Sequence, residues 1–147
     1  MDNIGYMLAD NSRLLRRIFD DRVRALGVTG PQARLLLILA RDGGRNQGFY
    51  AERLEVEPIT LCRMLDRLED AGMVERRRDP SDRRAWQVFL TGLAQGRVED
   101  LRNCVDDLIE ETLCGLTASE RTTLASLLDR MRSNLGARRN AQEAANG

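Results

Sequence analysis

The sequence predicts a mainly α-helical chain with one small β-hairpin, an α+β fold. Along most of the 147 residues, apolar side chains recur every three or four positions, which is the period of an amphipathic helix. Two short stretches between residues 73 and 91 instead alternate apolar and polar side chains around a loop rich in aspartate and arginine. The length suits one compact domain or two small intertwined units.

The first two predicted helices differ in how much of their surface is apolar. Apolar residues at helical spacing from Ile4 to Leu26 predict one long amphipathic helix that ends at Gly27. Thr29 offers a side-chain cap for the second helix, and Pro31 suits its first turn. The run ARLLLILA, residues 33–40, is apolar on nearly every side, so we expect this helix to be buried.

A short helix and a longer one precede the hairpin. Glycines at positions 43, 44 and 48 interrupt the helical period, and the short helix is predicted from about Gly48 to Leu54. The turn EVEP, residues 55–58, leads to a helix from Ile59 to Ala71, which Gly72 ends in the left-handed cap position. The expected inner face of that helix consists of Ile59, Leu61, Leu65 and Leu68.

The hairpin is predicted from two strands, Met73 to Arg78 and Trp86 to Thr91, joined by the loop DPSDRRA. Alternation places Trp86, Val88 and Leu90 on one face, so the sheet can pack on the helices while its loop projects into solvent. Neighbouring strand residues point to opposite faces, so at least one of the three consecutive arginines should bond to protein. The basic residues concentrated here are Arg76, Arg77, Arg78, Arg83 and Arg84.

Two further helices complete the chain. Apolar residues from Leu93 to about Gly115 trace a second long amphipathic helix. Thr117 and Glu120 form a capping box for the last helix, whose apolar stripe continues to Leu135. Residues 136–147 are small, polar and unpatterned, so we expect no regular structure there, only a flexible tail.

Two absences in the composition exclude whole classes of chemistry. The chain has no histidine, and its 23 basic residues are all arginine. Catalytic Ser-His-Asp sites, H-E-x-x-H zinc sites and the lysine-dependent phosphate loop are therefore impossible. The paired acids at residues 106–107 and 110–111 occupy consecutive helix positions and diverge, so a solvated surface is expected. We expect no enzyme, no metal ion and no cofactor.

Cysteine content and hydropathy favour a soluble cytoplasmic protein. Three cysteines, Cys62, Cys104 and Cys114, are too few and too scattered for a disulfide framework or a zinc site. No apolar run approaches the roughly 20 residues of a membrane span. The N-terminus lacks the basic and apolar regions of a secretory signal.

The order of helix, tight turn, helix and basic hairpin is that of a winged helix-turn-helix, whose second helix enters a DNA major groove. The formal net charge is zero, so the arginines of the loop stand out as a local concentration of positive charge. In a wing, such arginines neutralise phosphates or enter the narrow minor groove. The sequence therefore predicts double-stranded DNA as a partner.

Two segments carry a resemblance to a known family. The stretches AERLEVEPITLCRMLDRLEDAGMVERR and DPSDRRAWQVFLTGLAQG resemble the helix-turn-helix and wing of the MarR family of bacterial regulators, and the resemblance spans Ile4 to about Leu135. It implies an obligate homodimer on a palindromic operator. Residues 1–28 and 92–136 would form the helical dimerisation region, residues 29–91 the DNA-binding domain and residues 137–147 the tail. The long apolar stripes at both ends of so small a chain agree with a partner subunit.

The resemblance assigns the DNA contacts to the start of the recognition helix and to the wing. Thr60 and Arg63 are the expected readers of base edges, and Arg83 is expected in the minor groove. Arg84 either contacts DNA or pairs with Asp79 or Asp82 to hold the loop. The full set of expected DNA contacts is Pro58, Ile59, Thr60, Cys62, Arg63, Arg67, Arg77, Arg83 and Arg84.

The chain departs from the family pattern in the turn before the recognition helix. Glu55 and Glu57 stand in place of the commoner glycine and small polar cap. Glutamate is a poorer cap, and its negative charge lowers non-specific affinity for DNA.

The resemblance also implies an effector that releases a repressor from its operator. Many members bind a small aromatic acid between the dimerisation helices and the winged domain. Arg13 and Arg63 fall at positions that line this crevice, with Thr29, Ala33 and Leu37 along its wall. Two arginines at an apolar pocket suit a carboxylate, as in the control of aromatic catabolism, and a CoA thioester of such an acid is the competing effector. Alternatively, Arg13 is a solvated helix residue and Arg63 serves DNA only.

Two other functions compete with this interpretation. Cys62 lies beside Arg63, whose charge favours the reactive thiolate, so the chain could respond to thiol oxidation. In the alternative reading, Cys62 is a small buried apolar residue. A winged helix that binds another protein, without reading DNA, is the second competitor.

Overall fold

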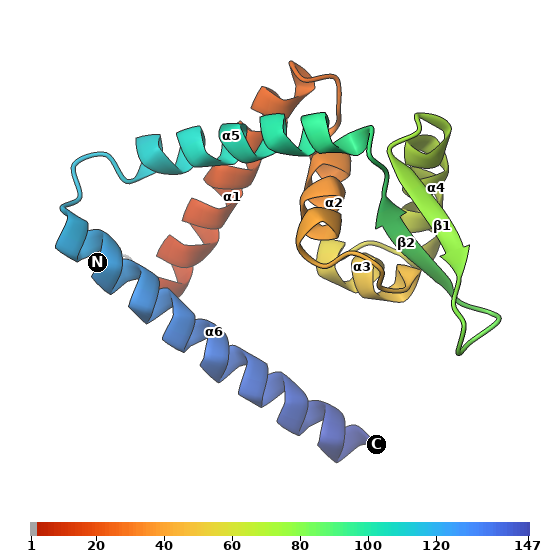
Figure 1. The fold of residues 1–147 in the computed structure, drawn as a ribbon. Coiled ribbons are helices and arrows are strands. Elements are labelled where there is room, and N and C mark those ends of the chain that lie inside the picture. The colour runs from red at the N-terminus through yellow and green to blue at the C-terminus, as the bar shows by residue number, and fades with distance from the viewer. Residues whose placement is uncertain (1–2) are drawn as a thin grey trace. The chain divides into compact units, whose positions relative to one another are not determined.

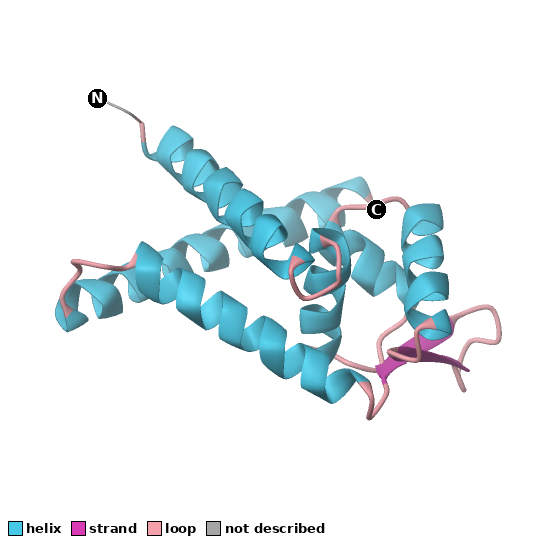
Figure 2. Cartoon of the chain, turned by 90° about the horizontal axis from the view of Figure 1, so that it is seen from above, coloured by secondary structure: helices cyan, strands magenta, loops and turns pink. Residues whose placement is uncertain are grey.

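The computed structural model describes residues 3–147, and within them the chain forms six helices and one two-stranded antiparallel sheet (Figure 1). The chain divides into two compact units, one ending at Leu108 and the other beginning at Ile109. The hairpin belongs to the first unit, and the rest of the chain is almost entirely helical (Figure 2). The mainly α fold with a small hairpin that the sequence predicts is confirmed.

The first two helices bury very different fractions of their side chains. The long helix α1, Ile4–Arg24, buries only Phe19 and Val23. The shorter helix α2, Gly30–Arg41, is capped by Thr29 and has Pro31 in its first turn, as predicted. Its buried residues form much of the core of the first unit and are Gly30, Ala33, Leu35, Leu36 and Leu39.

The helices α3, Gln47–Leu54, and α4, Pro58–Asp70, follow, and the hairpin lies beside them (Figure 1). Helix α3 begins one residue before the predicted start because Asn46 caps it by accepting a hydrogen bond from the Phe49 N–H. The buried side of α4 consists of Leu61, Leu65 and Leu68.

Ile59 does not belong to the inner face of α4 that was predicted for it. Its side chain is 63% exposed. At about 100° per residue, a position two before Leu61 lies on the opposite side of the helix. The prediction of an inner-face Ile59 is therefore wrong.

The sheet pairs β1, Val74–Arg78, with β2, Trp86–Leu90, in an antiparallel register that sets Arg76 opposite Val88. An isolated bridge between Asn46 and Gln87 joins the segment before α3 to the other edge of β2. The fully buried Val88 exchanges backbone hydrogen bonds with that segment, since its N–H donates to the Arg45 carbonyl and its own carbonyl accepts from the Gly44 N–H.

The last two helices are α5, Ala94–Thr112, which runs from the first unit into the second, and α6, Ala118–Asn146. The predicted capping box of Thr117 and Glu120 starts α6. None of the α6 residues is buried. Across residues 3–147, no helix combines the length and apolar content that crossing a bilayer requires.

The end of α6 differs from the sequence prediction. Regular structure was expected to stop near Gly136, yet the helix continues to Asn146. Strong helix formers fill this stretch, and Arg139 donates to Glu143 one turn later at 2.9 Å. Helix propensity and pairs one turn apart can hold a helix that has no apolar stripe. The absence of a stripe after Leu135 therefore did not mean that the helix ends there.

Candidate nucleic-acid interface

One side of α4 presents a polar face opposite its buried leucines. We call Ile59, Thr60, Arg63 and Arg67 the recognition face, and all four side chains are exposed. Their spacing places them on one side of the helix, facing away from Leu61, Leu65 and Leu68. Neither Arg63 nor Arg67 forms an ion pair or a side-chain hydrogen bond in the described part of the chain. Both guanidinium groups are therefore available to an external anion or base edge.

The turn before α4 shows the effect of the two unusual glutamates. Glu55 adopts a left-handed conformation with φ of 55°, the position that glycine normally fills. Glu57 is the residue before the first turn, and its side chain makes no capping hydrogen bond. Helix α4 nevertheless begins at Pro58, so the exposed Pro58 lies at the start of the recognition helix as expected.

The wing loop, residues 79–85, uses its own carboxylates to hold its shape. Asp79 Oδ1 accepts hydrogen bonds from the Ser81 N–H at 2.9 Å and the Ser81 hydroxyl at 2.7 Å. These bonds hold the pKa of the Asp79 carboxyl below its usual value. Asp82 Oδ1 accepts a hydrogen bond from the Arg84 backbone N–H at 3.0 Å. The acids of the loop are thus engaged with its hydroxyl and backbone groups.

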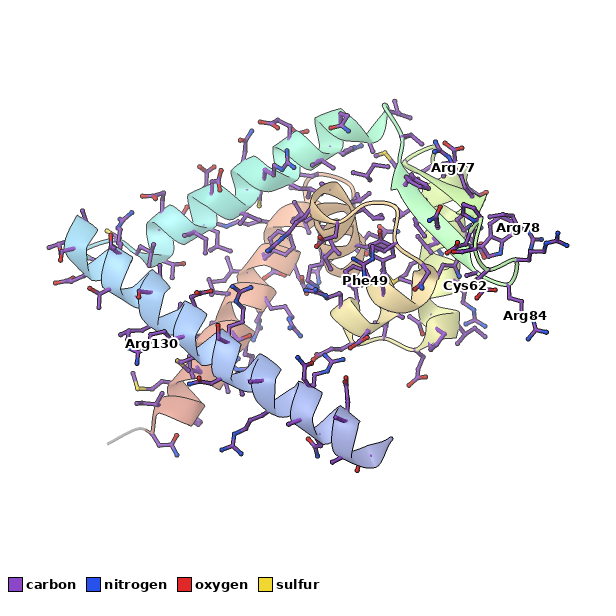
Figure 3. The ribbon with its side chains drawn as sticks, turned by 60° about the horizontal axis from the view of Figure 1, so that its bottom comes forward. Phe49, Cys62, Arg77, Arg78, Arg84 and Arg130 are labelled. Atoms are coloured by element: carbon purple, nitrogen blue, oxygen red, sulfur yellow. The ribbon has the colours of Figure 1, made fainter. Side chains whose placement is uncertain are left out.

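Arg83 and Arg84 consequently keep their guanidinium groups free. Neither side chain forms an ion pair or hydrogen bond within residues 3–147. The Arg84 side chain extends away from the ribbon of the loop in Figure 3. Of the two predictions for Arg84, pairing of its side chain with Asp79 or Asp82 is not observed.

The three strand arginines have three different surroundings. Arg76 reaches α4, where it pairs with Asp66 and Glu69. Arg77, on the opposite face, pairs with Glu75 at 3.0 Å, and its Cζ lies 4.4 Å from the centroid of the Phe89 ring. The prediction that at least one of these arginines bonds to protein is confirmed. Arg77 remains exposed, although its guanidinium group is already paired with the Glu75 carboxylate.

Arg78 holds the base of the wing loop. Its Nη1 donates to the Arg83 carbonyl at 2.7 Å, and its Cζ lies 4.4 Å from the centroid of the Trp86 ring. Figure 3 shows Arg78 and Arg84 at the same end of the hairpin. Stacking and a backbone bond fix the Arg78 side chain, whereas no residue from 3 to 147 restrains the Arg83 and Arg84 side chains in this way.

A further cationic cluster, at the start of α3, was not predicted from the sequence. The Cζ atoms of Arg45 and Arg53 lie 4.4 Å and 5.0 Å from the centroid of the Phe49 ring. Phe49 and Arg53 are four residues apart in α3, which is one helical turn, and this spacing was the signal that could have revealed that half of the stack, whereas Arg45 precedes the helix. The aromatic ring holds one arginine of α3 and one of the segment before it.

The predicted effector residues are not gathered in the groove found on α1. That groove has a volume of 620 Å³, and of the predicted effector residues only Arg13 lines it. Arg13 is paired with Asp10 at 2.6 Å, whereas Arg16 and Arg17, also in the lining, have no partner within residues 3–147. Asp20 in the lining pairs with Arg34 of α2 at 2.5 Å.

The other predicted effector residues lie elsewhere. On α2, Thr29 is used as the cap, Ala33 is fully buried in the core and Leu37 is partly buried against it. Arg63 lies on the recognition face of α4. A crevice between these residues and Arg13 remains a prediction.

Cys62 lies on a different side of α4 from the recognition face. It is half-buried, and its Sγ is 4.0 Å from Nη1 of Arg76, so the cation beside the sulfur is Arg76. The sequence interpretation had assigned that role to Arg63. Cys104 and Cys114 are also free thiols.

Comparisons with known proteins agree with this geometry. The sequence model of the MarR family matches residues 28–86 of this chain. An uncharacterized HTH-type transcriptional regulator of Bacillus subtilis, YdgJ, is 31% identical over 109 residues, which is 74% of this chain and 66% of that protein. The match therefore spans just under two thirds of the length of that relative.

Two solved structures share the fold over nearly their whole length. Apo wild-type MarR from E. coli is 29% identical, with a TM-score of 0.79 over 89% of this chain and 97% of that one. The transcriptional regulator PA3341 is 33% identical, with a TM-score of 0.80 over 92% of this chain and 99% of that one. Given the helix order, the hairpin and these likenesses, the chain belongs to the MarR family of winged helix-turn-helix transcriptional regulators.

Proposed function

We propose that this regulator is a homodimeric repressor that lays the recognition face in a DNA major groove and its wing loop on the adjacent backbone. The supporting observation is that Arg63, Arg67, Arg83 and Arg84 have no protein partner in the described residues. The chain has equal numbers of acidic and basic residues, 23 each, so unpaired arginines are not an effect of excess positive charge. Proteins of this family are regulators and not enzymes.

The homodimer is supported by two apolar surfaces that the chain leaves exposed. In α1, Ile4 is 71% exposed, and Tyr6 and Met7 also lie open to solvent. Helix α6 buries no residue at all, although it carries exposed leucines up to Leu135. Exposed apolar area of this kind is stabilised by a second copy. In the proposed dimer, residues 1–28 and 92–136 form the interface and residues 29–91 bind DNA.

The proposed effector is a small aromatic carboxylate or its CoA thioester. Support comes from the arginines along α1 and from Arg63, whose fork geometry suits a carboxylate. Oxidation of Cys62 is the competing signal, and the guanidinium of Arg76 beside its sulfur favours it.

DNA binding is tested with a promoter-region duplex and the variant Arg83→Ala. Arg130, an exposed arginine of α6 without a partner in the described residues, supplies the matched control Arg130→Ala. We expect Arg83→Ala to weaken binding and to reduce the slope of log affinity against log salt by about 0.9, the loss of one phosphate contact. Arg130→Ala should leave both unchanged. A wild-type chain that is monomeric, or that retains no duplex at low salt, would refute the proposal.

The signal is tested by treating the wild-type complex with a panel of benzoates and cinnamates and, separately, with peroxide. We expect one aromatic acid to release the DNA, and Arg13→Ala to lose that response. Release by peroxide that disappears in Cys62→Ser would instead identify thiol control. If the acid response survives in Arg13→Ala, Arg13 is not part of the effector site.

A further inference from the structure

We propose that Arg76 is a positioning residue that ties the wing to the recognition helix and thereby sets the sequence specificity of DNA binding. This inference rests on the proposed DNA-binding function. It assigns to Arg76 a role different from that of the free arginines at the wing tip, and it makes Asp66 and Glu69 of α4 its anchors.

The tie consists of four hydrogen bonds between β1 and α4. Arg76 Nε and Nη2 donate to the two carboxylate oxygens of Glu69 at 3.3 Å and 3.1 Å. The same Nη2 donates to Asp66 Oδ1 at 2.5 Å. The Arg76 backbone N–H also donates to Glu69, at 3.1 Å. A planar fork bound to two carboxylates restrains direction as well as distance.

The two anchors, Asp66 and Glu69, lie on the side of α4 that faces β1, and Cys62 lies on the same side. Cys62, Asp66 and Glu69 lie one helical turn apart along α4, and all three contact the Arg76 side chain. Arg76 itself lies on the sheet face that carries the buried Val74 and Val88. The polar tie therefore runs beside the apolar contact between β1 and α4.

This surrounding leaves Arg76 unsuited to contact a phosphate. Its side chain is only 18% exposed, and each of its three nitrogens has a protein partner. Arg77, the next residue, is 56% exposed; among residues 3–147 its ion pair is with Glu75 of its own strand, and it also lies over the Phe89 ring of β2. The ion pair between Arg77 and Glu75 joins two residues of β1, so it cannot fix the angle between β1 and α4.

The expected consequence concerns specificity more than affinity. Base readout requires the recognition face and the wing loop to meet the duplex in one fixed register, whereas phosphate attraction tolerates small rotations. Without these hydrogen bonds, β1 still packs on α4 through apolar side chains, but the orientation of the wing relative to α4 is less restrained. The ratio of specific to non-specific affinity should then fall by roughly tenfold, which is what one lost base contact costs.

The test compares Arg76→Gln with the matched variant Arg77→Gln. Each removes one positive charge from the same strand and leaves carboxylates behind, so the general electrostatic loss is shared. Binding is measured for a duplex that wild type selects from a random pool and for a scrambled duplex of the same composition. We expect only Arg76→Gln to lower the specificity ratio. Equal ratios in the two variants would overturn the proposal.

A second variant separates the tie from net charge. Glu69→Gln removes a negative charge, so electrostatics alone would raise affinity for both duplexes. The lost tie should nevertheless lower the specificity ratio, a change that general destabilisation of a still folded dimer would not produce. Exchange of the pair, Glu69→Arg with Arg76→Glu, should restore most of the ratio. Failure of both effects would contradict the positioning role.

The tie can also be tested without DNA. Hydrogen exchange of the Arg76 backbone N–H should be slow in wild type and accelerate by about tenfold or more in Glu69→Gln, because that N–H donates to the Glu69 carboxylate. Unchanged exchange would overturn the tie even if DNA binds. If wild type retains no duplex while this acceleration is seen, the proposed function fails and the tie between wing and helix stands.

Discussion

The base and the tip of the hairpin use the same residue type in opposite ways. At the base, Arg76 is bound to two carboxylates of α4. Arg78, at the end of β1 that meets the wing loop, is also held, because it is bonded to the Arg83 carbonyl and stacked on Trp86. At the tip, Arg83 and Arg84 have no side-chain partner among the described residues, because Asp79 and Asp82 are occupied with the loop's own hydroxyl and N–H groups. A cluster of arginines in a sequence is therefore not a uniform surface. Its function depends on which carboxylates the fold leaves free.

The largest expected difference between base and tip concerns stability. Leu65 of α4 is fully buried in the core that also contains Val74 and Val88 of the strands. Leu65→Ala should lower the free energy of unfolding by about 2–5 kcal/mol, through lost burial and the cavity left behind. Arg84→Ala at the tip should change it by less than about 0.5 kcal/mol. Denaturant unfolding at fixed protein concentration measures both, and similar losses would show that the tip is part of the core.

A smaller effect is expected at a glycine that packs on the base. Gly44 has φ of +79°, and a Cβ added there would lie 2.9 Å from Cε1 of Phe89, the ring on which Arg77 is stacked. Gly44→Ala should therefore cost about 1–2 kcal/mol from the left-handed backbone alone, with the displaced ring adding to it. Gly92→Ala is the matched control, because an added Cβ meets nothing within 4 Å. Equal melting temperatures of the two variants in thermal unfolding would contradict this account.

The smallest effect is expected on acidification. The Arg76 side chain holds the pKa of Glu69 below its usual value, and Ser81 does the same for Asp79. A carboxyl with a lowered folded pKa stabilises the fold above its unfolded pKa, and that contribution is lost as pH falls through the folded value. Below about pH 4, both the tie at the base and the turn at the tip should therefore loosen. Amide NMR of Arg76 and Ser81 would follow them separately, and shifts that stay constant down to pH 2 would contradict the prediction.

Much of the fold followed from local rules. Helical periodicity, the caps at Thr29 and Thr117 and the alternation around the wing loop predicted both strands and the bounds of the helices to within a few residues, except at the end of α6. The errors arose where a local pattern was a poor guide. Ile59 was assigned to the inner face although it lies across the helix from Leu61, and the last turns of α6 form without an apolar stripe.

The candidate site was only partly accessible from the sequence. The concentration of arginine in the hairpin was visible, and so was the alternation that forces one strand arginine toward protein. The stack of Arg45, Phe49 and Arg53 was not predicted, because Arg45 precedes α3 and its contact with the ring does not follow from helical spacing. The predicted effector wall included Ala33, which the fold places fully inside the core.

By itself, the sequence determined the order of the elements and the excess of arginine at the wing, because these depend on residue spacing along the chain, and two of its segments carried the resemblance to the family. Only the tertiary structure decided which arginines are free. Arg76 is bound because Asp66 and Glu69, on another element, come within hydrogen-bond distance of it. Pairing between elements depends on how a helix packs against a strand, and no local pattern contains that information.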